Sequence, residues 1–249
     1  MKLSVQLYTL RDQTSKDFAA TMREVAAIGL RYVELAGFGN VAAARDAKKI
    51  LGNNGLSVSG AHIGLEKLGD DINAVLDEQQ LLGNRFVIVP WLGESHRTIE
   101  GYRRVAAALN RAADQCATRG IELAYHNHSF EFQLFDGQSG MDILLNNTEP
   151  RVGFELDVYW LAHGGQDPAK FIARVGKRAR LLHLKDMAAG AERRFAPVGS
   201  GVLDFESILR AGREAGAEFG AIEQDVCYDL APIESVRQSL AYLKSLGLS

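Results

Sequence analysis

The 249-residue sequence predicts an α/β protein that folds as a single-domain (β/α)8 TIM barrel over residues 1–249. Three observations predict this fold. Eight short apolar runs alternate with eight helical patterns, and no linker, low-complexity tract or composition shift divides the chain. Glycine follows six of the helical patterns, where helices commonly end. Parallel strands need helical crossovers and cover on both faces, which a closed barrel of this length provides.

The expected elements follow the period of the apolar residues. Strands are expected at residues 3–8, 32–36, 56–62, 86–90, 121–127, 152–157, 181–186 and 220–223. Helices are expected at residues 16–28, 41–53, 71–82, 98–119, 140–146, 167–175, 205–215 and 233–246. The glycines after helices are Gly29, Gly55, Gly83, Gly120, Gly216 and Gly247. A doubly wound open sheet is the alternative, but residues 8–12 (YTLRD) lack the glycine-rich turn that normally follows its first strand.

Composition limits the class of protein. Hydrophobic residues make up 47% and charged residues 24%, as in ordinary globular proteins, and no apolar run approaches the roughly 20 residues that span a bilayer. The first residues, MKLSVQLYTLRD, lack the features of a secretory signal, and two cysteines make no disulfide framework. We therefore expect a cytoplasmic protein with no membrane partner. A net charge of −3 argues against a large nucleic-acid interface.

Residues 121–132 (IELAYHNHSFEF) contain the first candidate functional residues, two histidines. If residues 121–127 form a strand, His126 and His128 point to the same face, because side chains alternate along a strand. A lone pair of this kind is more often hydrogen-bonded within the core. Three later strands, however, also acquire ionisable residues only near their ends, at Glu155 and Asp157, at His183 and Lys185, and at Glu223 and Asp225. In a parallel barrel these ends converge on one pocket.

Four of these residues form a candidate metal site. His126, Asp157, His183 and Glu223 come from four consecutive expected strands and offer imidazole and carboxylate ligands. Such ligands suit one catalytic divalent ion, with manganese expected first and cobalt, magnesium, iron or zinc as alternatives. The alternative is a hydrogen-bonded polar network, although burying so many ionisable groups without a cation is costly.

The whole chain resembles the xylose isomerase-like TIM-barrel superfamily, the sugar phosphate isomerase/epimerase group related to ketose 3-epimerases and inosose dehydratases. The resemblance rests on VELAGF, GAHIGLE, AYHNHSFEF, ELDVYWLAHGGQDP, LHLKD, PVGSGVLDF and IEQD. It implies one divalent ion held by Glu, Asp, His and Glu from strands five to eight. Asp157, His183 and Glu223 match the last three positions, whereas His126 replaces the first glutamate.

The departures from the family pattern affect the expected reaction. In the epimerases two glutamates act as an acid/base pair on opposite faces of the sugar, and the change at His126 breaks that pair. Inosose dehydratases of the group also place histidines at this motif, which favours elimination. Trp160 stands where relatives often have a metal-binding histidine, and the zinc ligands of endonuclease IV are lacking, so DNA repair is not expected.

The expected chemistry is proton abstraction next to the carbonyl of a keto-sugar or derivative, through an enediolate stabilised by the metal. The enediolate can give an isomer, an epimer or, by loss of a substituent, a dehydratase or lyase product. Glu223 is the first candidate for the base, with Lys185, His128 and Glu155 as alternatives. For Lys185 an ion pair with Glu155 or Asp157 is an equally good interpretation.

The remaining polar and aromatic residues that we expect near this pocket are candidates for binding the sugar. His62 and Glu34 are candidates for binding hydroxyls, Trp91 and Trp160 for stacking on a ring, and Arg194 belongs to a candidate lid at residues 193–199. The structural alternatives are strand-end hydrogen bonding for His62, core packing for the tryptophans and a solvated loop for Arg194. A non-catalytic sugar-binding barrel subunit is the alternative of a different class. The resemblance also implies a homo-oligomer, because barrels of this group are often oligomeric.

Overall fold

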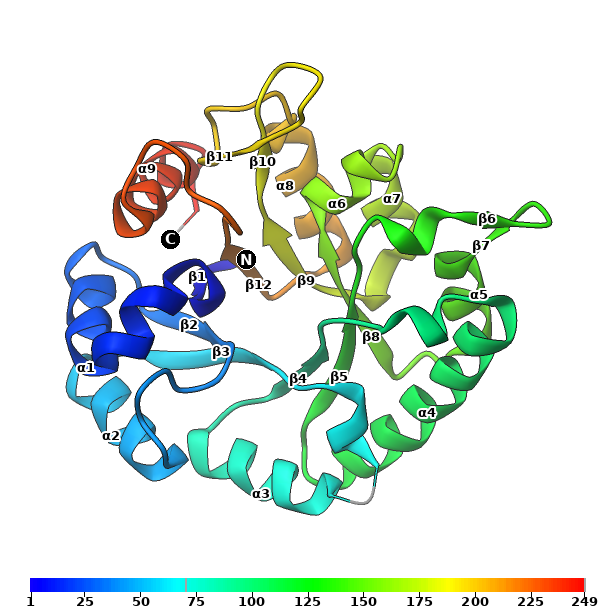
Figure 1. Ribbon diagram of the computed structural model, residues 1–249, viewed down its shortest axis with the longest axis horizontal. Coiled ribbons are helices and arrows are strands. Elements are labelled where there is room, and N and C mark those ends of the chain that lie inside the picture. The colour runs from blue at the N-terminus through cyan, green and yellow to red at the C-terminus, as the bar shows by residue number, and fades with distance from the viewer. Residues whose placement is uncertain (70, 249) are drawn as a thin grey trace.

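The computed structural model describes residues 1–69 and 71–248 and shows eight parallel strands closed into a barrel (Figure 1). The strands are β1 (Lys2–Gln6), β2 (Tyr32–Leu35), β3 (Ser57–His62), β4 (Phe86–Val89), β5 (Glu122–His126), β8 (Val152–Asp157), β9 (Ala179–Leu184) and β12 (Phe219–Ile222). They follow one another around the barrel in chain order, and β12 closes it against β1. The single-domain (β/α)8 prediction is confirmed.

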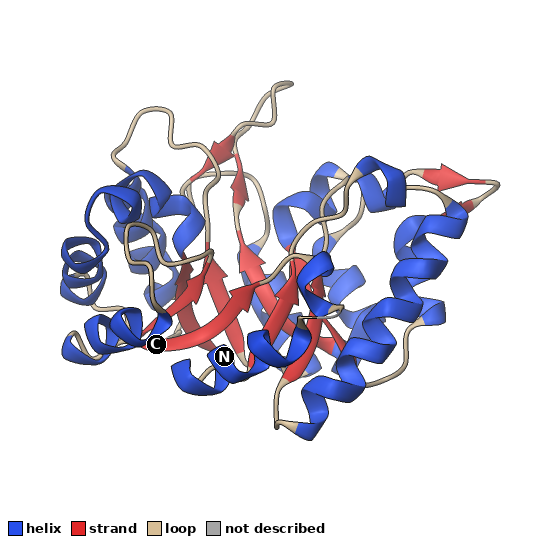
Figure 2. Cartoon of the chain, turned by 60° about the horizontal axis from the view of Figure 1, so that its bottom comes forward, coloured by secondary structure: helices blue, strands red, loops and turns tan. Residues whose placement is uncertain are grey.

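Helices surround the strands on the outside (Figure 2). They are α1 (Arg11–Ala27), α2 (Ala44–Asn53), α3 (Ile72–Leu82), α4 (Ile99–Thr118), α5 (Gly140–Asn147), α7 (Pro168–Val175), α8 (Phe205–Ala215) and α9 (Pro232–Ser245). Side-chain caps fix several starts, because a polar side chain satisfies a free N–H of the first turn. Thr98 accepts a hydrogen bond from the Gly101 N–H at 3.0 Å, and Ser139 forms a capping box with Asp142. Gly83 and Gly216 end α3 and α8 in the left-handed conformation that glycine adopts at little cost.

The first βα unit differs from its prediction. β1 ends at Gln6 because the Gln6 side chain accepts a hydrogen bond from the Tyr8 N–H, which starts the 3-10 helix η1 (Leu7–Leu10). α1 then begins at Arg11 instead of residue 16 and is kinked at Asp17, whose backbone is not helical. The Asp17 side chain accepts a hydrogen bond from the Ala20 N–H at 2.8 Å and so caps the second part of α1. The expected helix therefore corresponds to that second part.

Smaller elements lie in the loops between the strands and helices. A six-residue helix, α6 (Val158–His163), follows β8 and was not expected from the sequence. Two hairpins project there, β6 (Leu134–Phe135) with β7 (Gln138–Ser139) and β10 (Asp186–Met187) with β11 (Phe195–Ala196). Short 3-10 helices are η2 (Leu65–Leu68), η3 (Glu94–His96), η4 (Phe130–Phe132) and η5 (Gly176–Arg178). Among the described residues, no helix combines the length and apolarity needed to cross a membrane.

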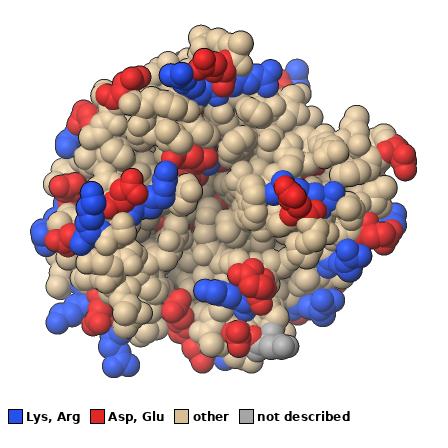
Figure 3. All heavy atoms as spheres, in the orientation of Figure 1, with Lys and Arg blue, Asp and Glu red and all other residues tan. Residues whose placement is uncertain are grey.

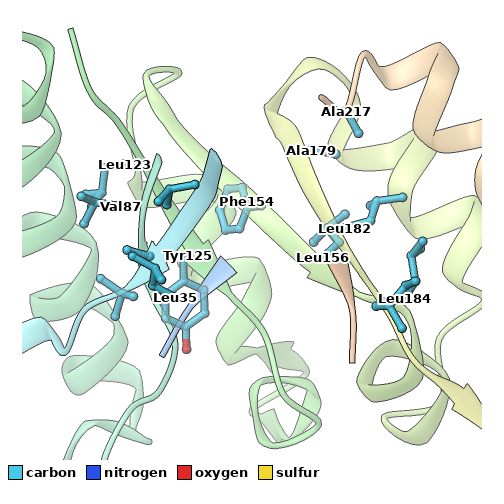
Figure 4. Packing of buried hydrophobic residues seen from close by; sticks show 14 of the residues in the cluster. Leu35, Val87, Leu123, Tyr125, Phe154, Leu156, Ala179, Leu182, Leu184 and Ala217 are labelled. Atoms are coloured by element: carbon cyan, nitrogen blue, oxygen red, sulfur yellow. The ribbon is translucent and has the colours of Figure 1, made fainter. Parts of the chain in front are cut away.

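Two apolar clusters hold the barrel. The larger one fills the layer between strands and helices, and Figure 4 shows Leu123, Tyr125, Phe154, Leu182 and Leu184 in it. The smaller one lies inside the barrel and consists of Phe86, Ile88, Ala124, Leu181 and Phe219. Because side chains alternate along each strand, His126 and His183 take the next inward positions after Ala124 and Leu181, and Glu223 takes the second inward position after Phe219. The inner cluster is therefore an apolar layer beneath a polar site.

Candidate active site

A cavity of about 600 Å³ opens at the C-terminal ends of the strands. Figure 3 looks onto this face, which is hollowed near its centre. The lining residues come from loops and strand ends around the whole barrel: Tyr8, Ala36, His62, Pro90, Trp91, His126, His128, Ser129, Phe130, Trp160, Lys185, Glu223 and Asp225. This position is where catalytic residues of parallel barrels lie.

His183 is the centre of the buried polar network below the cavity. Its Nδ1 lies 2.7 Å from Glu223 Oε2, and its Nε2 lies 2.6 Å from Glu34 Oε1 and 2.9 Å from Glu155 Oε2. The side chains of His183, Glu34 and Glu155 are fully buried. Three carboxylates from three strands thus share one imidazole.

His62 and His126 belong to the same network and also line the cavity. His62 Nε2 lies 2.9 Å from Glu155 Oε2 and 3.1 Å from Glu34 Oε1. His126 Nδ1 lies 3.0 Å from Glu155 Oε2, while its Nε2 lies 3.8 Å from Asp157 Oδ2. Gln6 Nε2 donates to Glu34 Oε1 at 2.7 Å. His126 is therefore oriented by Glu155 and faces Asp157 with its other nitrogen.

Lys185 joins three carboxylates at the rim of the cavity. Its Nζ lies 2.7 Å from Glu223 Oε2, 2.8 Å from Asp225 Oδ1 and 3.1 Å from Asp157 Oδ2. The expected pairing with Asp157 is present, whereas the described contacts of Lys185 do not include Glu155. Burial alone would lower the pKa of Lys185, but the three carboxylates raise it well above its usual value. Lys185 is accordingly charged.

The histidines divide into charged and neutral groups. Burial lowers the pKa of His62 and His183, but their carboxylate partners outweigh it, so that the pKa of His62 rises to about 9 and that of His183 lies well above its usual value. Burial and the neighbouring His183 hold the pKa of His126 well below its usual value. Burial and Lys185 lower the pKa of His128 to about 3. The carboxylates are thus balanced by protons on two histidines and by Lys185.

The donors fit a divalent cation. Two groups place their ligand atoms within 4.8 Å of one another: Asp157, His183 and Glu223 form one group, and His62, His126, Glu155 and His183 form the other. Glu34 Oε2 and Glu155 Oε1 are buried without a hydrogen-bond partner, which is costly for a carboxylate. Imidazole nitrogen and carboxylate oxygen are ligands of manganese, iron, cobalt and zinc, and a cation would supply the positive charge that the protonated histidines now provide.

The candidate metal ligands are close together but are divided between these groups. Asp157, His183 and Glu223 share one group, whereas His126 belongs to the other. The candidate bases Glu223, Lys185 and His128 reach the cavity, while Glu155 lies below it among histidines. A ligand in the cavity can therefore contact Glu223, Lys185 and His128, whereas Glu155 contacts the histidines and does not line the cavity.

The candidate substrate-binding residues differ in where they lie relative to the cavity. His62, Trp91 and Trp160 line the cavity, and Trp91 is 51% exposed instead of packed in the core. Glu34 is fully buried beneath the cavity, where it binds His62 and His183. Arg194 lies outside the cavity lining on the β10–β11 hairpin, where its Nε donates to Glu192 Oε2 at 2.6 Å.

The comparisons with known proteins now decide the family. A family model described as a xylose isomerase-like TIM barrel matches residues 22–246. The chain belongs to this family. An inosose dehydratase of Lacticaseibacillus casei is 27% identical over 138 residues, which cover 49% of this chain and 46% of that protein, so the match spans about half the length of this relative. An inosose dehydratase of Geobacillus thermodenitrificans is 24% identical over 209 residues, which cover 69% of this chain and 70% of that protein.

A solved structure extends the similarity to the full barrel. A sugar phosphate isomerase/epimerase from Parabacteroides distasonis has a TM-score of 0.86 and 26% sequence identity, covering 98% of this chain and 93% of that chain. The expectation of a xylose isomerase-like barrel is confirmed. These relatives are named as enzymes, and in this chain a buried cluster of His, Glu and Asp side chains adjoins the cavity.

Two residues at the site of this xylose isomerase-like barrel were not predicted from the sequence to have a function. Asp225 pairs with Lys185, and the signal for it is its position two residues after Glu223, on the same face of the chain. Phe130 lines the cavity from η4, and its ring lies 5.0 Å from the ring of Trp91. No local pattern distinguishes Phe130 from a core residue, because its exposure depends on how the loop folds back over the strand end.

Proposed function

We propose that the protein is a divalent-metal-dependent enzyme that removes a proton next to the carbonyl of a keto-sugar or derivative, passes through an enediolate, and returns the proton to give an isomer or epimer. The observation that supports it is the convergence of buried carboxylates and imidazoles under a cavity of about 600 Å³. A site with this donor set at the mouth of a barrel suits metal-assisted proton abstraction.

Asp157, His183 and Glu223 would hold the ion, with His126 adjacent to them. When bound, the ion, for which manganese is our first candidate, would polarise the carbonyl and stabilise the negative charge that develops on its oxygen. The position of the group next to the cavity supports this assignment, because Glu223 both belongs to the group and lines the cavity.

Glu223 is the proposed base. Burial would raise its pKa, but Lys185 and His183 outweigh burial and hold the pKa of Glu223 below its usual value. The carboxylate is thus ionised and can accept a proton from a substrate carbon. Lys185, being charged and paired with Glu223 at 2.7 Å, would keep this carboxylate ionised.

His128 is the proposed second proton carrier. Its pKa of about 3 keeps it neutral, its Nδ1 has no hydrogen-bond partner, and it lines the cavity. A neutral imidazole can accept or relay a proton. Glu155 is better placed to orient His62 and His126 than to touch substrate.

Elimination of a hydroxyl or another β-substituent from the same intermediate is the second candidate, as in a dehydratase or lyase acting on a keto-sugar, keto-glycoside or inosose. Two observations favour it. The matched curated relatives are named inosose dehydratase, and His126 stands where family epimerases carry the second glutamate of the acid/base pair.

Solvent deuterium exchange tests the proposal. Protein loaded with manganese would be incubated in D2O with ketoses, 3-keto-sugars and inososes, and exchange at the carbon next to the carbonyl would be followed by NMR. We expect exchange with at least one compound and a loss of about 100-fold or more in Glu223→Gln, with the exposed Glu206→Gln as control. Binding of a sugar without exchange would instead indicate a non-catalytic barrel.

A further inference from the structure

The cavity has an aromatic wall, formed by Trp91, His128, Phe130 and Trp160. The ring of Trp91 lies 4.7 Å from the ring of His128 and 5.0 Å from that of Phe130, and the ring of His128 lies 5.3 Å from that of Trp160. His128 already has a proposed role as a proton carrier, but proton abstraction at Glu223 does not require the apolar surfaces of Trp91, Phe130 and Trp160. The wall therefore needs an explanation of its own.

The wall is held in place without a ligand. The Arg97 guanidinium lies 3.7 Å from the centre of the Phe130 ring and 4.6 Å from that of Trp91, and it donates two hydrogen bonds to the Leu92 carbonyl. Trp91 remains 51% exposed although its neighbours fix it. An exposed, preorganised aromatic surface inside a cavity is typical of a binding subsite, because little entropy is lost when a flat group stacks on it.

The charges that line the cavity disfavour a phosphorylated ligand. Among the described residues that line it, Lys185 is the only lysine or arginine, and it is already paired with Asp157, Glu223 and Asp225. Arg11, behind Tyr8, donates to the backbone carbonyls of Tyr8 and Asp225. A phosphate carries close to two negative charges and needs free cationic donors, which this acidic cavity does not offer.

The size of the cavity leaves room beyond one sugar ring. Cavities of about 300 to 1,000 Å³ accommodate drug-sized ligands, and this one has a volume of about 600 Å³. Four acidic and imidazole side chains line one part of the cavity and form its acidic floor: His62, His126, Glu223 and Asp225. The aromatic wall lines another part.

We propose that the substrate is an uncharged glycoside, in which the keto-sugar ring lies on the acidic floor and a second flat group, an aryl aglycone or a second sugar ring, stacks on the aromatic wall. This rests on the proposed function for the identity of the reacting ring. It assigns Trp91 and Phe130 to substrate selection, and it predicts that a phosphate on the sugar is rejected.

Calorimetry on manganese-loaded protein tests this with methyl and phenyl 3-keto-β-D-glucopyranoside, 3-keto-cellobiose and the 6-phosphate of the methyl glycoside. We expect the phenyl glycoside or the disaccharide to bind about three- to tenfold more tightly than the methyl glycoside, and the phosphate to bind more weakly. Whichever of the phenyl glycoside and the disaccharide binds more tightly identifies the source of the second group.

Trp91→Ala should abolish this preference, and Tyr228→Ala should retain it, because Tyr228 is similarly exposed at 45% but does not line the cavity. Thermal melting would verify that both variants are folded. Equal binding of all neutral glycosides, no binding, or tighter binding of the phosphate would overturn the proposal. A preference in binding without deuterium exchange would leave the aromatic subsite standing and contradict only the proposed function.

Discussion

Lys185 Nζ lies 2.7 Å from Glu223 Oε2, at the point where β9 and β12 end side by side. Both side chains are almost fully buried, and Asp157 and Asp225 contact the same ammonium group. One ammonium group thus contacts three carboxylates. Removing it would leave buried negative charges without their partner.

Lys185→Met is therefore expected to lower the free energy of unfolding by about 3–5 kcal/mol, the usual cost of breaking a buried ion pair on one side. Urea denaturation at neutral pH would measure the change. Lys170→Met is the control, because Lys170 is 86% exposed and its pair with Asp167 should contribute less than about 1 kcal/mol. Equal effects of the two substitutions would contradict the role given to Lys185.

Asp186 is expected to organise the loop that follows the β10–β11 hairpin. Its buried carboxylate accepts hydrogen bonds from the N–H groups of Gly199 and Gly201 at 2.9 Å and of Leu203 at 3.2 Å. Asp186→Ala leaves these donors unpaired and should cost at least about 2 kcal/mol of stability. Faster limited proteolysis within residues 188–203 should accompany the loss.

The matched control for that loop is Asp204→Ala. Asp204 caps α8 through the Ser207 N–H at 3.1 Å, so its loss should lower stability less than Asp186→Ala does, without new cleavage before residue 203. Unchanged proteolysis in Asp186→Ala would show that the loop is held by other contacts.

Glu131 should make stability depend on pH. Burial raises its pKa from about 4.5 to about 7, although Tyr125 and the His128 N–H bind its charged form. Between these two values the folded state holds a proton that the unfolded state has lost, so this group's contribution to stability decreases as pH rises from about 4.5 to about 7 and is constant above.

Comparison with Glu131→Gln isolates that contribution. The free energy of unfolding of the wild type minus that of the variant should decrease between pH 5 and pH 7.5, by on the order of 2–3 kcal/mol. Urea denaturation at both pH values would measure it. A difference that does not change with pH would mean that Glu131 is ionised in both states.

Much of the barrel could be predicted because its signals are local. Alternation along β5, β8 and β9 puts His126, Asp157 and His183 on inward positions, and glycines such as Gly83 mark helix ends. Helix α6 escaped prediction, because six residues carry too little periodicity and its start depends on the Asp157 side chain accepting the Trp160 N–H.

Partnerships within the site could not be predicted, because they depend on closure of the barrel. Glu34 and His183 meet at 2.6 Å although 149 residues separate them, and no pattern near either residue encodes that contact. The exposure of Trp91 and the position of Arg194 outside the cavity lining likewise depend on loop paths.

Anomalous diffraction from crystals grown with manganese is the most direct test of the central claim, that a single divalent ion binds where β8, β9 and β12 end. We expect one strong peak within about 2.0–2.3 Å of ligand atoms of Asp157, His183 and Glu223. The same crystals of Asp157→Asn should show a greatly reduced peak. The absence of any peak in the wild-type cavity, or a peak held by His62 and Glu155 instead, would contradict it.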